Sequence, residues 1–443
     1  MINRRKFLET AIAAAAATQA RPLFASDAKG IQGANDRIRV GIIGCGTRGN
    51  QVSTDWMKHA DSVFIAACDV AKDRLDSTAA RLGKTQGNTL DTYEDYRRIL
   101  ERKDVDAVLI ATPDHWHSPM TIEAISAGKD VYCEKPVSNE IEPAVKMLEA
   151  VRKSNRVVQI GTQQRSWHHF QEAAKLFHDG YVGTMVNHCQ MCPPGGGGGG
   201  PQQQPQPAGP QPIPAGFNWE MFQGPAKRKP FVPGRRNWRG WYDYGGGNLT
   251  DWGVHLTDIM NWFMKTDGKA PLMTSASAQY VRLARDPERV PDTYAVTWQY
   301  ENFVATLSNA MVPGTQDPRD LYGNYFFGDK GVLLVNRIGY EVKPYIPTPP
   351  RTAAPNPNAP PPVPPIEAKK FRDPSGMSEI AESSFGSATH RHVRNFLDCV
   401  KSRQKPVANI DIGFYSTLPT LLAIVSVKEG RTVRWDDKGL KST

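Results

Sequence analysis

The stretch RVGIIGCGTRGN, residues 39–50, decides how the first part of this chain folds. Its apolar run is typical of a buried strand, and the glycine-rich turn GCGTRG follows without a break. Glycines at that spacing allow a tight turn into a helix and a close approach of a ligand to the backbone. The stretch therefore predicts the strand, turn and helix that begin a dinucleotide-binding unit.

The chain continues with short apolar runs that alternate with helical stretches. The runs are SVFIAACD, AVLIAT, DVYCEK and VVQIGT, and amphipathic stretches such as DTYEDYRRILER lie between them. Alternation of this kind predicts βαβ units around a parallel sheet. We therefore expect an α/β protein in which residues 36–160 form a Rossmann domain.

Beyond that domain the apolar runs follow one another with few helices between them. They are TMVNHCQM, LMTSASAQYVRL, TYAVTWQYEN, FVATLSNAM and VLLVN. This order predicts a second α/β domain, residues 161–436, with an open and mainly antiparallel sheet, and HRHVRNFLDCVKSR is expected to be a helix that packs back onto the body. The Pro- and Gly-rich segments 193–216 and 344–367 lack the apolar residues that a core needs, so we expect flexible insertions there.

Composition narrows the class of protein. A chain of 443 residues is too large for one ordinary core, which favours two domains. The net charge of +9 comes without a run of Lys and Arg interleaved with aromatics, so no nucleic-acid binding is predicted. Cys189 and Cys192 form a lone CxxC that is open to a disulfide, a metal or plain thiols, and with no second pair nearby plain thiols and no metal site are favoured.

The first 25 residues are typical of a targeting segment. The paired Arg4-Arg5 ahead of an Ala-rich stretch resembles a twin-arginine export signal, and an ordinary basic leader is the alternative. The Ala-rich stretch and the later run LPTLLAIVSV are both shorter than the ~20 residues that a spanning helix needs. We expect an exported, periplasmic protein that is soluble after processing. Cleavage after Ala20 and cleavage after Ala25 are the two alternatives.

A carboxylate follows the second apolar run. Asp69 comes twenty residues after Gly49, where an acid can hold the hydroxyl pair of the adenosine ribose. An acid there repels the 2′-phosphate of NADP, which favours NAD. Because Lys72 and Arg74 lie nearby, NADP remains the alternative cofactor.

Two further motifs follow the third and fourth expected strands. ATPDHWH begins at Ala111, and EKP places Lys135 directly after a strand. Ligands bind beyond the carboxyl ends of the strands in such folds. Taken alone, however, a lysine or histidine at such a position is more often solvated than catalytic. This applies to Lys135, His115 and His117.

The stretch GGGNLTDWGVHLTD, residues 245–258, joins three glycines to an acid and a histidine. A helix that begins near Asn248 or Thr250 puts Asp251 and His255 one turn apart on the same face, which Asp258 continues. The glycines allow another group to approach the backbone closely.

Taken in order, GxGxxG, ATPxxxH, EKP and the glycine-led DxGxH resemble the Gfo/Idh/MocA oxidoreductases, from about Arg37 to Asp436. The resemblance implies a Rossmann domain joined to an open-sheet α/β domain. It implies that Lys135, Asp251 and His255 line a cleft over the nicotinamide, and we expect a homo-oligomer formed through the open sheet. The implied cofactor contacts are Gly44, Gly46, Thr47, Arg48, Gly49, Asp69, Thr112, Pro113, His117, Glu134 and Lys135.

The chemistry of alcohol oxidation agrees with this set. A base and a group that stabilises the developing negative oxygen must converge on one hydroxyl. We assign His255 as the base and Lys135 as the stabiliser, while Asp251 orients His255 or holds a neighbouring hydroxyl. The expected substrate contacts are Gln163, Gln164, Arg165 and, within the aromatic stretch NWRGWYDY, Trp241, for which core packing is the alternative.

These observations predict an NAD(P)-dependent oxidoreductase acting on a secondary hydroxyl of a sugar, cyclitol or glycoside. One alternative is a glycoside hydrolase or lyase that uses transient oxidation, although the glycosidases of the family usually lack the EKP lysine. Another is a non-catalytic carbohydrate-binding protein that holds a nucleotide. Because little free NAD is expected outside the inner membrane, export predicts that the cofactor is loaded beforehand, retained and re-oxidised in place.

Overall fold

The computed structural model describes residues 37–194, 209–281, 283–309, 322–345, 366–373, 387–436 and 439–441. The expected export signal and most of both low-complexity insertions lie outside the described residues. The two sheets and their helices lie within them.

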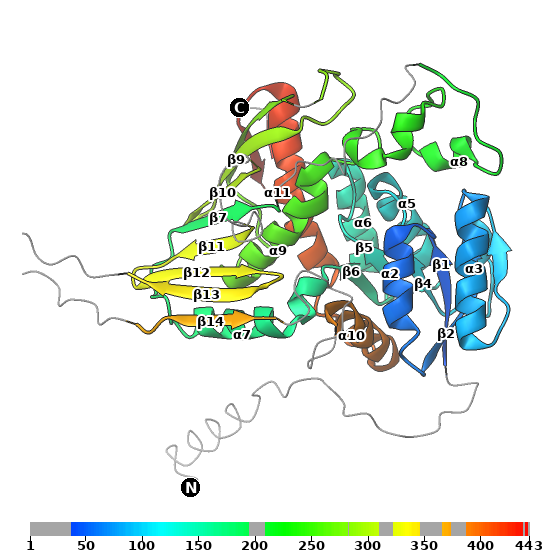
Figure 1. Ribbon diagram of the computed structural model, residues 1–443, viewed down its shortest axis with the longest axis horizontal. Coiled ribbons are helices and arrows are strands. Elements are labelled where there is room, and N and C mark those ends of the chain that lie inside the picture. Colours follow the sequence, from blue (N-terminus) through cyan, green and yellow to red (C-terminus); the bar gives the residue numbers. More distant parts are fainter. Residues whose placement is uncertain are drawn as a thin grey trace, which may run out of the picture. The chain divides into compact units, whose positions relative to one another are not determined.

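Six parallel strands form the first sheet in the order β3-β2-β1-β4-β5-β6. The order reverses beside β1, so the carboxyl ends of β1 and β4 part and leave a crevice for a ligand. Helices flank this sheet on the right of Figure 1, and the predicted Rossmann domain is confirmed. The elements are β1 (Ile38–Ile43), α2 (Thr47–Trp56), β2 (Ser62–Cys68), α3 (Lys72–Gln86), β3 (Asp91–Tyr93), α4 (Arg97–Leu100), β4 (Ala107–Ile110), α5 (Asp114–Ser126), β5 (Asp130–Glu134), α6 (Ile141–Lys153) and β6 (Val158–Gly161).

Ten strands form the second sheet in the order β14-β13-β12-β11-β7-β10-β9-β8-β15-β16. Its neighbours are antiparallel except for the parallel pair β7 and β10, which confirms the mainly antiparallel prediction. The short strands β13 to β16 were not predicted from the sequence, because charged residues interrupt their apolar pattern. The strands are β7 (His188–Cys192), β8 (Met273–Gln279), β9 (Thr293–Gln299), β10 (Val304–Ser308), β11 (Gly323–Phe327), β12 (Gly331–Asn336), β13 (Gly339–Pro344), β14 (Lys369–Arg372), β15 (Val433–Asp436) and β16 (Gly439–Lys441).

All six cysteines are free thiols. Cys189 is buried and Cys192 is half-buried, and both lie on β7. Side chains alternate between the faces of a strand, so residues three apart point to opposite faces. This geometry explains why the CxxC pair forms no bridge.

Helices of the second domain lie between its sheet and the Rossmann domain. Figure 1 shows α9 and α11 in this position. The helix expected late in the chain is α10, and it does return to the Rossmann domain, where Phe396 meets Trp56 at 5.5 Å between ring centroids. The helices are α7 (His168–His178), α9 (Val254–Phe263), α10 (Ala388–Ser402) and α11 (Ile410–Glu429), with the 3₁₀ turn η2 (Gln163–Ser166) and the π-helical turn η5 (Leu249–Gly253).

The run LPTLLAIVSV lies inside α11, which is longer than the run suggested. Among the described helices, α11 has 20 residues and is apolar enough to cross a membrane by length and composition. However, 72% of its apolar window is buried inside the protein. Its apolar character is therefore explained by packing as a core helix between the two domains.

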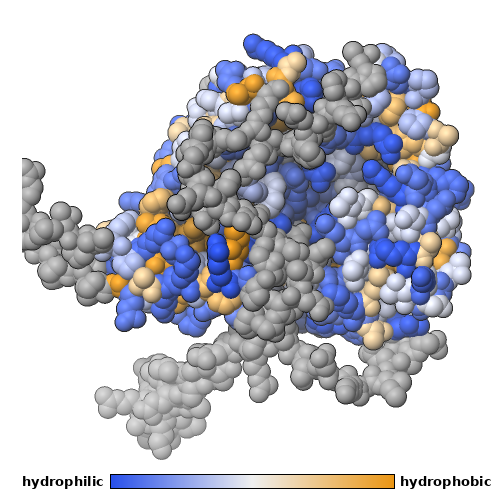
Figure 2. Space-filling view, viewed as in Figure 1, coloured by the Kyte–Doolittle hydropathy of each residue, from blue (hydrophilic) through white to orange (hydrophobic). Residues whose placement is uncertain are grey.

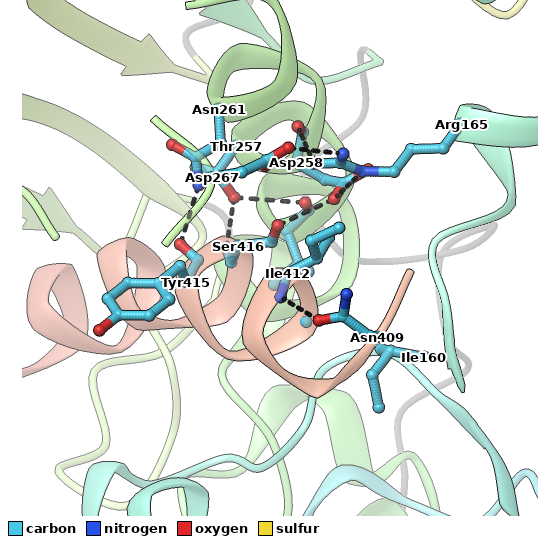
Figure 3. Close-up of polar contacts among 12 residues, drawn as sticks. Ile160, Arg165, Thr257, Asp258, Asn261, Asp267, Asn409, Ile412, Tyr415 and Ser416 are labelled. Carbon is cyan, nitrogen blue, oxygen red and sulfur yellow. Dashed lines mark hydrogen bonds and ion pairs between the residues drawn. The ribbon is translucent and has the colours of Figure 1, made fainter. Parts of the chain in front are cut away.

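Buried polar contacts hold α9 against α11 and η2, as Figure 3 shows. Asp258 of α9 accepts hydrogen bonds from Arg165 at 2.8 Å and from Ser416 of α11 at 2.8 Å. Arg165 also pairs with Asp267 at 2.6 Å. Farther along α9, Asn261 donates to the backbone oxygen of Tyr415 at 2.9 Å. The helix that carries His255 is thus fixed by charge pairs as well as by apolar contacts.

We expect Arg165→Met to destabilise the fold by ~3–5 kcal/mol, because it leaves the buried carboxylate of Asp258 without its cation. Urea unfolding measures this loss. Arg152→Met is the matched control, since Arg152 and Asp411 form an ion pair at the surface, and such pairs contribute less than ~1 kcal/mol. Equal losses in the two variants would show that the Arg165 pair does not support the fold.

Candidate active site

A cavity of about 450 Å³ lies where the carboxyl ends of the Rossmann strands face the second domain. Its volume falls within the range of pockets for small molecules and cofactors. Figure 2 shows the described surface hollowed near the centre of the view, with hydrophilic residues around the hollow. Loops after β1, β2, β4 and β5 line the cavity on one side, and residues of the second domain line it on the other.

The glycine-rich turn after β1 fits the pyrophosphate of a dinucleotide. Gly44 has φ +97°, and a Cβ there would lie 2.6 Å from the backbone oxygen of Ala111. A Cβ on Gly46 would meet only the Arg74 guanidinium, at 3.6 Å, so this part of the cavity wall is open. Helix α2 begins at Thr47 beside it, and backbone N–H groups at a helix N-terminus favour an anion.

Asp69 lies at the end of β2, and its carboxylate is fixed by the backbone. One oxygen accepts from Cys45 N–H at 2.7 Å and the other from Ala71 N–H at 2.8 Å. Burial raises the pKa of Asp69, and these two hydrogen bonds oppose the rise. Asp69 lines the cavity where the adenosine ribose is expected, and Arg74 lines it too.

The loops after β4 and β5 are joined to each other and to α2. Both ring nitrogens of His117 contact backbone oxygens, that of Pro136 at 2.6 Å and that of Thr112 at 2.9 Å. Glu134 accepts from Arg48 Nε at 2.8 Å. These contacts fix the backbone on both sides of Lys135. Thr112, Pro113, His117 and Glu134 all line the cavity, as do Gly44, Gly46, Thr47 and Arg48.

Lys135 makes an ion pair with Asp251 across the two domains. Its Nζ donates to the backbone oxygen of Asp251 at 2.7 Å and to Oδ1 at 2.9 Å. The other carboxylate oxygen of Asp251 lies 3.2 Å from Arg239 Nε. Burial alone would raise the pKa of Asp251, but Lys135 and Arg239 outweigh it and hold that pKa below its ordinary value. Asp251 is therefore an anion that holds the lysine in the cavity wall.

His255 lines the same cavity as an uncharged base. Its pKa is lowered well below 6.5, chiefly by burial and then by the positive charges of Lys135, Arg337 and Arg48. Its Nδ1 is buried and has no hydrogen-bond partner within the described part of the chain. A neutral imidazole with an unused nitrogen can accept a proton.

The start of this helix differs from the expectation. The Asn248 side chain makes no cap, and η5, a π-helical turn that contains Asp251, precedes α9. Asp251 and His255 still line one cavity, but Asp251 binds Lys135 and makes no hydrogen bond that would orient His255. The lysine pair replaces the first of the two roles that we expected for Asp251.

Five of the expected site residues lie outside the cavity. Gly49 packs against the turn, where a Cβ would lie 2.0 Å from the oxygen of Gly44. Arg165 forms ion pairs with Asp258 and Asp267. Gln163 and Gln164 are buried beside it in η2. Trp241 donates to the oxygen of Gly234 at 3.0 Å and packs in an aromatic cluster. Trp238 and Trp252, which are near Trp241 in the sequence, do line the cavity.

Several charged residues of the cavity wall were not predicted from the sequence. Arg337, in the turn between β12 and β13, stacks over Trp252 at 4.4 Å. Asp114 begins α5 and accepts from Thr250 Oγ1 at 2.9 Å. Burial raises the pKa of Asp114 to about 7, against the positive charges of Lys135 and Arg239. The one signal for Asp114 was its position in ATPDHWH, directly after a strand.

Residues 209–244, here called the cover segment, pack against the Rossmann domain. The segment contains α8 (Trp219–Gln223) and two 3₁₀ turns, η3 (Pro233–Arg236) and η4 (Trp238–Gly240), and α8 lies at the upper right of Figure 1. Lys72 N–H of α3 donates to the oxygen of Gly216 at 2.8 Å, and Trp116 Nε1 of α5 donates to that of Phe222 at 3.0 Å. The cover segment also lines the cavity through Phe217, Met221, Phe222, Arg236, Asn237, Trp238 and Arg239.

Comparisons with known proteins agree with this geometry. Residues 38–162 match a family described as "Oxidoreductase family, NAD-binding Rossmann fold", and residues 204–332 match "Oxidoreductase family, C-terminal alpha/beta domain". Together the two ranges cover more than half of the chain.

Curated relatives and solved structures are similar over different lengths. Inositol 2-dehydrogenase 4 of Saccharopolyspora erythraea is 31% identical over 168 residues, which are 36% of this chain and 48% of that protein. A glycosyl hydrolase family 109 protein of the same organism is 27% identical over 203 residues, 42% of this chain and 44% of its own. The chain thus spans less than half the length of these curated relatives. The aldose-aldose oxidoreductase from Caulobacter crescentus shares the fold, with a TM-score of 0.61 and 21% identity over 90% of this chain and 99% of its own.

Asp114 generates a prediction about stability and pH. An acid whose pKa is raised in the folded protein loses stability as the pH rises from its ordinary pKa, 3.8, through the folded value of about 7. Asp114→Asn removes the ionisation, so we expect this variant to be more stable than the unmodified protein above pH 7, by on the order of 2–4 kcal/mol. Unfolding measured at several pH values should show the advantage shrinking towards pH ~4. A difference that is constant with pH would contradict the assignment.

Proposed function

The chain belongs to the Gfo/Idh/MocA oxidoreductase family, and we propose that it transfers hydride between a nicotinamide cofactor and a secondary hydroxyl of a sugar, cyclitol or glycoside. The observation that carries this proposal is the meeting of Lys135, Asp251 and His255 in one cavity with the glycine-rich turn. A cation and an uncharged base beside a nucleotide cradle are what alcohol oxidation requires.

The cofactor fits the cavity wall at one end. Backbone N–H groups around Gly46 and Thr47 suit the pyrophosphate, and Asp69 suits the ribose hydroxyls. NAD is therefore the cofactor of the proposal, with NADP kept open by Arg74, which lines the same end. When bound, the nicotinamide supplies the hydride acceptor for oxidation and the hydride donor for reduction.

Lys135 and His255 divide the handling of the substrate hydroxyl. The ammonium of Lys135 has three protons and gives two hydrogen bonds to Asp251, so one proton remains for the substrate oxygen. That positive charge stabilises the oxygen as its proton leaves. His255 accepts the proton, and its lowered pKa makes it release the proton readily afterwards. Trp238 and Trp252 form part of the cavity wall around them.

The relatives support sugars and cyclitols as the substrate class. One curated relative is named an inositol 2-dehydrogenase, and a structure of the same fold is named an aldose-aldose oxidoreductase. A second candidate is a glycoside hydrolase or lyase that oxidises and then reduces the same sugar, which the similarity to a glycosyl hydrolase family 109 protein favours. A non-catalytic carbohydrate-binding role is disfavoured, because it would not need a lysine, an acid and an uncharged base at one place.

Export and retention of the cofactor are part of the proposal. Arg4-Arg5 and the Ala-rich stretch support a twin-arginine signal and a periplasmic protein. The cover segment supports slow release of the cofactor, because Phe217, Met221 and Phe222 form part of the cavity wall. Its hydrogen bonds to α3 and α5 hold this part of the wall in place. A retained cofactor must be re-oxidised by a second sugar or by the same substrate.

Association through the open sheet completes the proposal. Tyr325 and Leu334 are paired across β11 and β12, as are Phe327 and Val332, and all four side chains are partly exposed. Apolar side chains gathered on one sheet face support an interface between copies of the chain. Light scattering that gives the mass of a single chain would contradict this element.

The catalytic assignment predicts a large loss of turnover. His255→Ala and Lys135→Ala should each lower kcat by ~10²-fold or more with little change in NAD binding, because each removes a group that handles the hydroxyl. The assay follows reduction of the cofactor across inositols, aldoses and glycosides, with the products read by NMR. Lys146→Ala on the exposed face of α6 is the control and should keep normal turnover. Normal turnover by either cavity variant would reject its role.

The cover segment predicts a cofactor that survives purification. Protein isolated from the periplasm without added nucleotide should release about one nicotinamide dinucleotide per chain on denaturation. Trp219 packs in the aromatic cluster within the cover segment and does not line the cavity, so Trp219→Ala should speed cofactor release by ~10-fold or more through loss of that packing. Trp435→Ala in β15 is the control. Cofactor-free protein that consumes added NAD at each turnover would instead indicate an ordinary dehydrogenase.

A further inference from the structure

Two adjacent residues of η5 contact two different loops of the Rossmann domain. Asp251 holds Lys135, which follows β5. Thr250 donates to Asp114, which follows β4, with 2.9 Å between Thr250 Oγ1 and Asp114 Oδ2. Thr250 is 1% exposed and Asp114 is 2% exposed. The proposed function uses Asp251 and Lys135 and gives no role to the second contact.

The direction of the Thr250 bond follows from its other partners. Gly246 N–H donates to Thr250 Oγ1 at 2.9 Å, so the hydroxyl oxygen acts there as an acceptor. The single hydroxyl proton is then left for Asp114. The other acceptor in reach, the backbone oxygen of Gly247, is farther away at 3.5 Å. Thr250 therefore connects the glycine turn ahead of the helix to a carboxyl group of the Rossmann domain.

The glycine turn reaches this position because it lacks side chains. A Cβ on Gly246 would lie 2.4 Å from Thr250 Cγ2 and 2.4 Å from Ile424 Cδ1. Gly247 has φ +61°, a conformation that glycine adopts without strain. The turn is thus held tightly between α11 and Thr250, and Thr250 in turn is held by Asp114.

We propose that Asp114 and Thr250 form a latch between the domains that sets the position of Asp251 and, through it, the position of Lys135 Nζ. Asp114 is then a positioning residue for the reaction, and the inference rests on the proposed function, in which Lys135 faces the substrate oxygen. Because Thr250 precedes Asp251 directly, a shift of Thr250 moves the Asp251 oxygen that accepts from Lys135 at 2.7 Å. A displacement of ~1 Å near a reacting group can lower a rate by ~10²-fold.

The character of Asp114 also supports a role beyond packing. An asparagine would accept the same hydrogen bond without a charge to bury. The pKa of Asp114 is raised by burial and by Asp251, and is lowered by Lys135 and Arg239, so its carboxyl group responds to the charges of the catalytic pair. Asp114 is therefore joined to the catalytic pair by charge as well as through its hydrogen bond with Thr250.

The test compares two buried threonines of one helical segment. Thr250→Val and Asp114→Ala open the latch from its two sides. Thr257→Val is the matched control, since Thr257 is fully buried and donates to the Ser416 oxygen of α11 at 2.6 Å, away from the Rossmann domain. Thr250→Val and Thr257→Val each lose one buried hydroxyl group, but only Thr250→Val loses the contact between the domains.

We expect Thr250→Val and Asp114→Ala to lower kcat at saturating NAD and sugar by ~10-fold or more, with KM for the sugar changed by less than ~3-fold. Thr257→Val should keep kcat within ~2-fold, even if its melting temperature falls as much as that of Thr250→Val. Thr250→Ser and Asp114→Asn keep a donor and an acceptor and should restore most of kcat. Normal kcat in Asp114→Ala, or the same loss in Thr257→Val as in Thr250→Val, would overturn the latch.

Hydrogen exchange tests the latch without any sugar. In the cofactor-loaded protein, peptides that span residues 244–256 should exchange faster in Thr250→Val and Asp114→Ala than in Thr257→Val, because the helix start is no longer held. That result supports the latch even if no sugar is turned over, in which case only the proposed function fails. Unchanged exchange in both latch variants would overturn the latch while leaving the proposed function intact.

Discussion

The ion pair between Lys135 and Asp251 is the contact on which the site depends. The lysine side chain is only 12% exposed, and a charge so far from water needs a partner of opposite sign. The partner comes from the other domain, so the pair has its 2.9 Å geometry only when both domains are folded and packed together. The lysine, its anionic partner and the base therefore meet in one cavity as a consequence of domain packing.

The second domain serves this pair by delivering one helical segment. Its ten-stranded sheet backs α9 and α11, and the contacts of Arg165 and Ser416 with Asp258 hold α9 in place. The same domain sends the cover segment back over α3 and α5. One domain therefore supplies the nucleotide cradle, and the other supplies the base, the partner of the lysine and the cover.

Charge balance within the cavity explains the state of each reacting group. Burial, together with the positive charges of Lys135, Arg337 and Arg48, lowers the pKa of His255 and keeps it uncharged. Lys135 and Arg239 outweigh burial at Asp251 and keep that carboxylate ionised. Asp114 adds a carboxyl group whose pKa of about 7 lies near neutral pH. Because these groups share one poorly solvated region, a change in the charge of one alters the proton affinity of the others.

The sequence by itself determined the fold class and the meeting of Lys135, Asp251 and His255 with the glycine-rich turn. GxGxxG after a strand, EKP at a strand end and an acid four residues before a histidine are local patterns, and local geometry is what spacing encodes. Tertiary structure decided which partner each charged or aromatic side chain meets. Arg165 looked like a substrate contact, but Asp258, 93 residues away, engages it. Trp241 entered a cluster while Trp238 reached the cavity, and Asp251 turned to Lys135, 116 residues away, instead of His255. Such choices depend on packing between distant segments, because burial forces each polar group to take whichever partner the fold brings within reach.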